Sequence, residues 1–279
     1  MDGYPIDLIC RTLNIGRSAY YRQKKEPYTA REAEEKELLS VTERLFRENR
    51  EEYGRKRMNK ALRQAGYSMS EGKTRILMRK GGLWPKQARK YKATTNSKHK
   101  YQVAENLLNR EFSAEKPNLK WCGDSTYIST DEGWMYAAGI IDLCDKTCVG
   151  LAFSERHTQE LMLTALDCAK RKYRPAPGLL FHSDRGVQYA AKAYKASLKK
   201  HGMVQSMSRS GNPYDNAPME SFWGTVKVGC VLGRRFKTRQ EAEQVIFEYV
   251  FGFYNTRRYH TSLGLETPLG HRKKLLQSA

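Results

Sequence analysis

The sequence predicts an α/β protein, with a mixed five-stranded sheet and flanking helices that follow an all-helical region. Residues 1–84 carry apolar side chains at helical spacing between short turns, whereas β-like runs begin only after about residue 113. The chain has 279 residues, which is long enough for about two domains. The change of pattern along the chain therefore indicates a helical domain followed by an α/β domain.

The charge of the chain favours a polyanionic partner. Fifty Lys and Arg against thirty Asp and Glu leave a formal net charge of +20, and such a charge attracts nucleic acid over a long range without specifying a fold. No apolar run approaches the length of a membrane span. The N-terminus lacks a basic segment followed by an apolar stretch, so no secretory signal is expected. These features predict a cytoplasmic, nucleoid-associated protein with no membrane partner.

The cysteines and histidines give no zinc pattern. The six cysteines form no C-x-x-C pair, and residues 1–98 contain no histidine. A His–Cys zinc module is therefore not expected in the N-terminal region. The cysteines are expected to be reduced and mostly buried.

The N-terminal region is expected to consist of basic helices. Residues 1–100 contain 25 Lys and Arg against 12 Asp and Glu, which accounts for +13 of the net charge. Helices are expected over 6–13, from a cap at Ser18, over 29–49, over 55–65 and over 71–79. Short basic helices joined by tight turns resemble helix-turn-helix DNA-binding units, although a solvated helical bundle is an alternative. Residues 85–112 are expected to form a basic linker that lies along phosphates.

Residues 113–279 are expected to fold around the sheet. Strands are expected over 120–128, 134–141, 148–153, 179–183 and 204–208. A hairpin loop over 129–133 would join the first two strands, and helices would follow a cap at Thr158, span 189–200 and begin at Met219. Three antiparallel strands followed by alternating helix and strand are compatible with an RNase-H-like core, among other mixed sheets.

Three acidic residues come from separate elements of this region. Asp124 lies within the first strand, Asp184 ends the fourth, and Glu220 begins the helix after the turn-rich loop 209–218. Sites in open α/β sheets collect at strand ends, and two or three carboxylates suffice to hold the pair of Mg²⁺ ions used in phosphoryl transfer on DNA. Spacing alone is weak evidence, because roughly three acidic pairs at the Asp184–Glu220 separation arise by chance.

The residues around these acids resemble a known family. The segments are WCGDSTYI over 121–128, FHSDRGVQY over 181–189, SMSRSGNPYDNAPMESFW over 206–223 and YNTRRYHTSL over 254–263. Together they resemble the bacterial insertion-sequence transposases of the B-frame (OrfB, IS-three type) branch of the retroviral-integrase superfamily. The likeness is strong over about residues 100–275 and weak in the helical region.

The resemblance implies an RNase-H-like integrase catalytic domain over 113–279 that ends in a basic C-terminal helix and tail. It implies a D,D-35-E triad of Asp124, Asp184 and Glu220 that binds Mg²⁺ (or Mn²⁺). The implied activity is 3′-end cleavage and strand transfer on double-stranded DNA, at transposon terminal repeats and target. A dimer or higher assembly would hold two ends. The resemblance also implies a fusion with an upstream-frame DNA-binding protein, of which this chain, with no heptad zipper, would be the catalytic partner.

Four further residues are expected to contact DNA. Lys227 lies seven residues after Glu220 and therefore on the same helix face, where the resemblance places it near transposon-end DNA. Arg257, Arg258 and His260 alternate with tyrosines and suit phosphate contacts. A solvent-facing side chain is the alternative for each.

Several neighbours of the acids have more than one interpretation. His182 is either a buried packing residue or a ligand near the metals, Asp142 is expected to cap a turn, and Asp215 with Asn216 is expected to fix the loop before Glu220. Two other functions also stay open: an RNase-H-like nuclease without strand transfer, and a non-catalytic DNA-binding regulator. The intact triad argues against the regulator.

Overall fold

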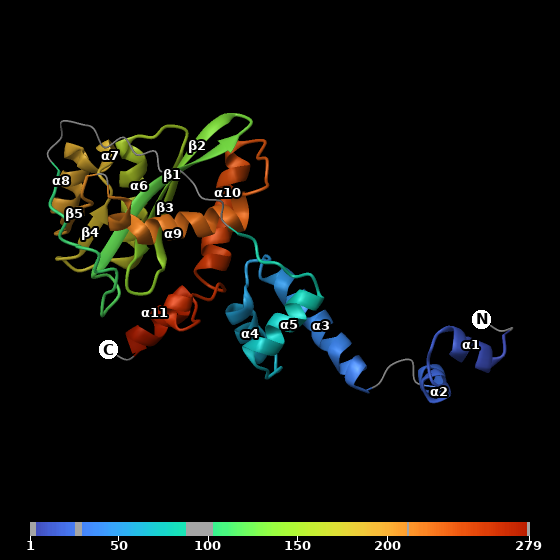
Figure 1. Cartoon of the computed structure of the whole chain (residues 1–279). Helices are drawn as coiled ribbons and strands as arrows, with labels where there is room; N and C mark the ends of the chain where they lie inside the picture. Colours follow the sequence, from blue (N-terminus) through green and yellow to red (C-terminus); the bar gives the residue numbers. More distant parts are fainter. Residues whose placement is uncertain (1–3, 26–29, 88–102, 211, 278–279) are drawn as a thin grey trace. The chain divides into compact units, whose positions relative to one another are not determined.

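The computed structural model describes residues 4–25, 30–87, 103–210 and 212–277 (Figure 1). The chain divides into two compact units, Met1–Pro85 and Lys86–Ala279. Within the described ranges, no helix has the length and apolar character needed to cross a bilayer.

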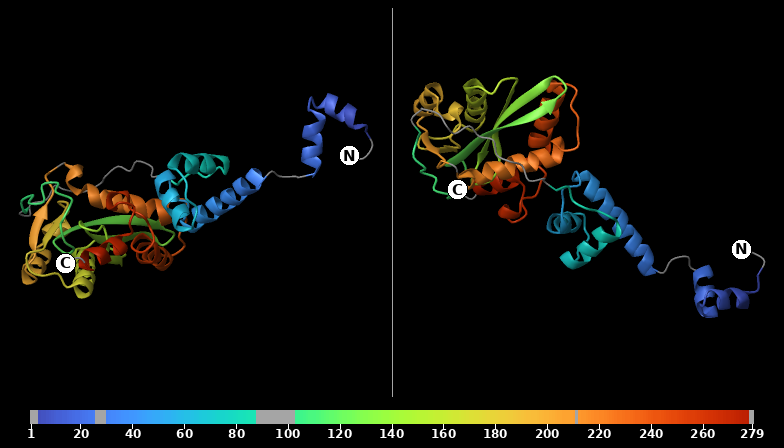
Figure 2. Two further views of the ribbon diagram at one scale, coloured as in Figure 1. Left: turned by 90° about the horizontal axis from the view of Figure 1, so that it is seen from below. Right: turned by 45° about the horizontal axis from the view of Figure 1, so that its top comes forward.

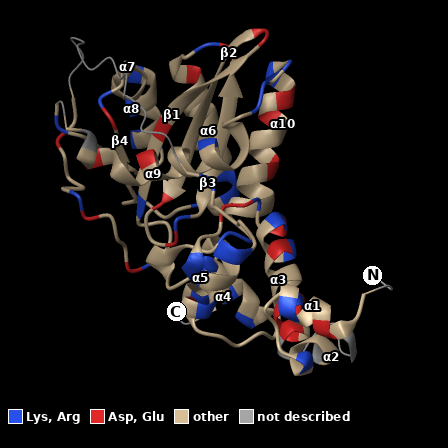
Figure 3. Cartoon of the chain, turned by 45° about the vertical axis from the view of Figure 1, so that its right-hand side comes forward, with Lys and Arg blue, Asp and Glu red and all other residues tan. Residues whose placement is uncertain are grey.

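The first unit is helical, as the sequence predicts. Its helices are α1 (Ile6–Thr12), α2 (Arg17–Lys25), α3 (Ala30–Glu48), α4 (Arg55–Gln64) and α5 (Glu71–Lys80). Helices α3, α4 and α5 contact one another around buried Leu38, Phe46, Met58, Leu62 and Leu77. Lys and Arg are prominent along α4 and α5 in Figure 3.

One helix start differs from the prediction, and one buried residue is polar. Helix α2 begins at Arg17, so Ser18 lies inside its first turn and does not cap it. On α3 the buried side includes a polar residue, Thr42, whose hydroxyl donates to the carbonyl of Leu38 at 2.6 Å. A threonine can be buried there because the preceding helical turn accepts its hydroxyl hydrogen.

The second unit contains the predicted mixed five-stranded sheet. Its strands are β1 (Lys120–Thr130), β2 (Gly133–Asp142), β3 (Cys148–Ser154), β4 (Leu180–Ser183) and β5 (Val204–Met207). They lie in the order β3-β2-β1-β4-β5. Strands β1, β2 and β3 are antiparallel neighbours, whereas β4 pairs in parallel with both β1 and β5. Three antiparallel strands followed by two parallel ones form an RNase-H-like sheet.

Helices cover both faces of this sheet. They are α6 (Gln159–Tyr173), α7 (Val187–Ala190), α8 (Lys192–Lys200), α9 (Ala217–Val226), α10 (Arg239–Tyr249) and, near the C-terminus, α11 (Pro268–Gln277). Helix α6 lies on one face, and α9 with α10 on the other (Figure 2). The approach is close: a Cβ on Gly150 would lie 2.4 Å from the carbonyl oxygen of Ala165 in α6. One on Gly139 would lie 2.9 Å from the ring of Trp223 in α9.

Pairing and packing in the folded unit change two predicted elements. The β1–β2 ladder continues to the pair Thr130–Gly133, so the expected five-residue loop is a tight turn at Asp131 and Glu132. The single helix expected over 189–200 is two helices, α7 and α8, because Ala191 adopts an extended backbone (ψ 144°). In both places the local pattern indicates the element, but pairing and packing set its ends.

The predicted linker over 85–112 also differs in its last part. Residues 88–102 lie outside the described residues, but residues 103–112 pack on the second unit. Leu108 is 1% exposed, its backbone N–H donates to the Ser206 hydroxyl at 3.1 Å, and Asn106 and Arg110 bind Asp215. Burial of Leu108 and pairing of these polar side chains make this segment part of the second unit.

A buried ionic cluster joins α11 to the sheet. The Arg272 guanidinium donates to Asp145 at 2.9 Å, to Asp142 at 3.3 Å and to Asn118 at 2.6 Å, and it lies 4.4 Å from the ring centre of Tyr173. Asp142 also accepts from the backbone N–H of Cys144 at 2.9 Å, which confirms that it caps the turn after β2. Burial and repulsion by Asp145 raise the pKa of Asp142.

Replacement of Arg272 by Met should destabilise the chain by about 3 kcal/mol, because two buried carboxylates would lose their shared cation. Chemical denaturation of the full chain measures the change in the free energy of unfolding. The matched control is Lys273→Met on the exposed neighbour, which should change stability little. An equal loss in the free energy of unfolding for the two substitutions would contradict the stabilising role given to Arg272.

Candidate active site

The sheet register brings Asp124 and Asp184 together. Gly123 on β1 pairs in parallel with Ser183, the last residue of β4, and each aspartate directly follows its member of this pair. Neighbouring strands lie about 4.8 Å apart, so the two carboxylates lie side by side at the end of β4. Asp184 is also held locally, because its Oδ1 accepts from the backbone N–H of Gly186 at 2.9 Å.

The two aspartates interact electrostatically. The pKa of Asp124 lies well above its usual range, first because of burial and then because of repulsion by Asp184. Glu220 acts on Asp124 in the same direction, and Lys227 acts in the opposite direction. Asp184 and Glu220 are therefore both close enough to Asp124 to influence its ionisation.

Glu220 is more open than the aspartates. It lies in the first turn of α9, exposed to solvent, while its neighbours Met219 and Phe222 are buried. Among the described residues, no three His, Cys, Asp or Glu side chains are arranged closely enough to hold a metal ion. The backbone thus brings the two aspartates together and places Glu220 on a helix beside them, without closing the three carboxylates into one cluster.

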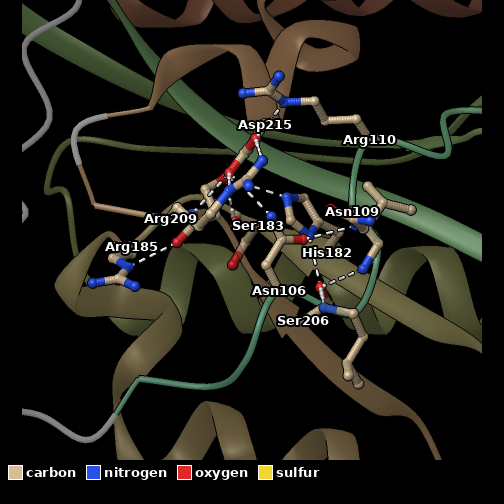
Figure 4. A network of polar contacts seen from close by, with 12 residues as sticks. Asn106, Asn109, Arg110, His182, Ser183, Arg185, Ser206, Arg209 and Asp215 are labelled. Carbon is tan, nitrogen blue, oxygen red and sulfur yellow. Dashed lines mark hydrogen bonds and ion pairs between the residues drawn. The ribbon is translucent and has the colours of Figure 1, made fainter.

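The loop before α9 is tied down by Asp215 (Figure 4). This buried carboxylate accepts from the backbone N–H of Arg209 at 3.0 Å and from its guanidinium at 2.9 Å. Arg110 donates to it at 2.8 Å and Asn106 at 3.0 Å. The hydrogen bond from the Arg209 side chain is the largest cause of a pKa of Asp215 far below its usual range.

The predicted role of Asp215 and Asn216 in fixing the loop is therefore confirmed. The Asn216 side-chain oxygen accepts from the Cys122 thiol at 3.0 Å, which links the start of α9 to β1. Glu220 follows one turn later. Its position beside Asp124 thus depends on a loop that is bonded to two other parts of the unit.

His182 is a buried packing residue. Its Nδ1 lies 2.9 Å from the Ser206 hydroxyl and its Nε2 lies 3.2 Å from the Ser208 hydroxyl (Figure 4). The side chain is fully buried, and burial lowers the pKa of His182 to about 4. A neutral imidazole between two serines joins β4 to β5 and has no surface for a phosphate.

Lys227 lies beside the carboxylates. It follows the last residue of α9, and its Nζ lies 5.3 Å from the ring centre of Tyr127. Burial lowers the pKa of Lys227, whereas the Asp124 carboxylate acts to raise it. The half-buried ammonium is therefore within electrostatic range of the Asp124 carboxylate.

The other three predicted DNA contacts differ in exposure. Arg257 is exposed, whereas Arg258 is only 7% exposed. His260 lies edge-on to the Tyr254 ring at 4.8 Å between ring centres, with its Nε2 3.4 Å from the Arg258 guanidinium. Little of Arg258 is thus open to DNA, since its side chain packs within the unit.

One residue near the acids was missed by the sequence analysis. His157, between β3 and α6, has its Nε2 2.8 Å from the hydroxyl of Ser125, the residue after Asp124. Its carbonyl accepts from the Gln188 amide at 3.1 Å, and its ring stacks on Tyr136 at 5.1 Å. His157 thus connects β1, β2 and α7 near both aspartates, but a single loop histidine outside any motif gives no signal in the sequence.

Comparison with known proteins places this site in a family. Models described as "Integrase core domain" match residues 114–213 and 201–268, and an "HTH-like domain" model matches residues 32–91. The transposase InsF for insertion sequence IS3A of Escherichia coli (strain K12) is 36% identical, with 95% of this chain and 93% of InsF covered. The chain belongs to the IS3-type transposase family. An insertion element IS600 protein of 31 kDa from Shigella sonnei is 43% identical, with 97% of this chain and all of that protein covered.

Family membership identifies this transposase as an enzyme of the polynucleotidyl transferase class. Solved structures with a similar fold include a simian T-cell lymphotropic virus intasome, at 14% identity and a TM-score of 0.47 over 76% of this chain and 70% of that one. The magnesium-bound catalytic core domain of HTLV-2 integrase is 12% identical, with a TM-score of 0.41 over 56% of this chain and 97% of that one. The strand order and the family, rather than these scores, identify the fold.

Replacement of Asp215 by Asn should destabilise the chain by about 2 kcal/mol, because hydrogen bonds from two arginines lose their charged acceptor. It should also speed hydrogen exchange at the Arg209 amide, which donates to Asp215. The control Asp131→Asn removes an exposed ion pair with Arg235 and should change the stability by less than about 1 kcal/mol. Unchanged exchange at Arg209 in Asp215→Asn would contradict the role given to this carboxylate.

The stability of the chain should fall as pH falls through the range from about 6.5 to about 4. Within this range the unfolded chain protonates His182, whereas the folded chain keeps it neutral, so acid favours unfolding by at most about 3 kcal/mol. Above pH 6.5 His182 is neutral in both states and does not reduce the free energy of unfolding, and the whole reduction is present by about pH 4. Urea unfolding at a series of pH values gives the free energy of unfolding as a function of pH. Between pH 6.5 and 4 this free energy should fall less steeply in His182→Gln than in the wild-type chain. Equal slopes in the two proteins would refute the prediction.

Proposed function

We propose that this transposase catalyses 3′-end cleavage and strand transfer at transposon ends with two Mg²⁺ (or Mn²⁺) ions bound by Asp124, Asp184 and Glu220. The observation that carries the proposal is the side-by-side placement of Asp124 and Asp184 on parallel strands. Both belong to segments that match the integrase core. Glu220 lies in the second matching segment.

The residues at the site fit hard divalent cations. Carboxylate oxygens are the donors that Mg²⁺ prefers, and two or three of them suffice because Mg²⁺ keeps several waters. Burial and mutual repulsion raise the pKa of Asp124, and a divalent cation is the partner that would let both aspartates ionise together. Glu220, exposed on α9, has the freedom to complete the set. When bound, such metals stabilise charge on the attacking and leaving oxygens of a phosphodiester.

The protein's own residues would position the DNA. The two aspartates are fixed by the sheet, so they define where the scissile phosphate lies. Lys227, seven residues after Glu220 and directly after the last residue of α9, would hold a phosphate next to the acids by charge. Arg257 and His260 would contact the DNA backbone further away, whereas the packing of Arg258 suits a role in holding this segment.

The parts of the chain would divide the work. We propose residues 1–84 as the region that binds DNA through its basic helices, residues 85–102 as a basic linker, and residues 103–279 as the catalytic domain. Double-stranded DNA, as transposon terminal repeats and as target, would be the substrate. Two ends must be held together, so the active complex would contain at least two copies, fused to an upstream-frame DNA-binding protein and acting at the nucleoid.

Replacement of Glu220 by Gln should reduce strand transfer at least about a hundredfold, because the variant loses a charged metal ligand, while DNA binding stays nearly intact. The assay incubates the full chain, alone and as the upstream-frame fusion, with labelled transposon-end DNA and Mg²⁺, and resolves products on a denaturing gel. Glu243→Gln, an exposed glutamate on α10, is the matched control.

Joined products that disappear on metal chelation and in Glu220→Gln would support the proposal. Full activity in Glu220→Gln would refute the triad. Shortened strands without joined products would instead indicate a nuclease.

A further inference from the structure

Two exposed aromatic side chains form a pair on the β1–β2 hairpin. Tyr127 on β1 is 39% exposed and Trp134 on β2 is 51% exposed. Their ring centres lie 5.0 Å apart and their planes meet at 88°. Trp134 pairs with Ser129 and is therefore the diagonal neighbour of Tyr127 on one face of the sheet. We call Tyr127 and Trp134 the aromatic pair.

The aromatic pair is linked to the proposed catalytic residues through strand β1 and through Lys227. Tyr127 is three residues after Asp124, and β4 pairs with β1 only as far as Gly123, so β4 does not extend along β1 as far as Tyr127. The Lys227 ammonium, 5.3 Å from the Tyr127 ring centre, is also within electrostatic range of Asp124. Lys227 thus connects the aromatic pair to the carboxylates.

The hairpin that carries the aromatic pair is held rigidly. The Arg239 guanidinium donates to the carbonyl of Trp134 at 3.1 Å and to that of Glu132 at 2.7 Å. The backbone N–H of Asp131 donates to the Phe236 carbonyl at 2.9 Å. A ligand that stacks on Trp134 therefore meets a surface whose backbone is already ordered, which reduces the entropy lost on binding.

We propose that the aromatic pair stacks on an unpaired nucleobase of the DNA strand that enters the active site. Every base has a π-face, and aromatic side chains bind such faces without regard to sequence, most effectively beside cations that attract the phosphates. A fully paired duplex hides these faces in its stack, so the aromatic pair selects a strand whose terminal bases have separated. The inference rests on the proposed function only in taking DNA as the ligand.

The location distinguishes this surface from the exposed aromatic side chain of Phe247. Phe247 on α10 is also exposed (53%) and lies 4.7 Å from Phe251, ring centre to ring centre. Phe247 is therefore a matched control: an exposed aromatic ring packed on another ring, on a different element from the β1–β2 hairpin.

The test compares two DNA duplexes of equal length and salt conditions, one blunt and one with mismatched, unpaired terminal nucleotides. Binding to the full chain is measured by gel shift in EDTA, where no cleavage occurs. The wild-type chain should bind the duplex with unpaired ends at least about fivefold more tightly. Trp134→Ala and Tyr127→Ala should lose this preference while they bind the blunt duplex as before, whereas Phe247→Ala should keep it and Trp134→Phe should restore most of it.

A second measurement reports directly on stacking of the unpaired base. The fluorescence of 2-aminopurine at an unpaired terminal position should be quenched by the wild-type chain and not by Trp134→Ala. No preference in the wild-type chain, or the same preference in Trp134→Ala, would overturn the proposal. If Trp134→Ala without DNA sediments differently from the wild-type chain but keeps the preference for unpaired ends, the aromatic pair contacts another copy of the protein and the proposal is overturned. Because the assay contains no metal and counts no product, its outcome is independent of whether the chain joins DNA strands.

Discussion

Strand β4 pairs with β1 over four residues, and this short parallel ladder decides where the carboxylates lie. The ladder ends at Gly123 and Ser183, so Asp124 and Asp184 leave it at the same level. Close packing enforces the register: a Cβ on Gly123 would lie 2.6 Å from the Phe181 ring on β4. The apolar core beneath β4 thus holds two like charges together, which neither carboxylate would favour alone.

Other parts of the unit are held by buried charges. The Asp215 carboxylate, just before α9, binds the segment before β1 and the Arg209 loop by hydrogen bonds. Arg272 joins α11 to the end of β2. A buried carboxylate that lost these partners would leave uncompensated charge in the interior. Each cluster therefore specifies one arrangement of segments that are distant in sequence.

Much of the fold could be predicted from local patterns, because alternating apolar residues and helical stripes report which face of an element is buried. The five strands and the basic N-terminal helices follow in this way. The tight turn at Asp131 and the break at Ala191 could not, since strand pairing and helix packing set those ends. The segment 103–112 looked like linker because its few apolar side chains, such as Leu108, find partners only in the folded unit.

At the site, the sequence by itself determined the family and the class of enzyme, through the motifs around the three acids, and it predicted those acids and Lys227 as the site residues. Only the tertiary structure decided how these residues meet. Sequence order carries no information on the β1–β4 register, on the burial of Arg258 and His182, or on the contact of His157 with Ser125. These depend on contacts between residues far apart in the chain, and such contacts form only when the sheet and its helices pack together.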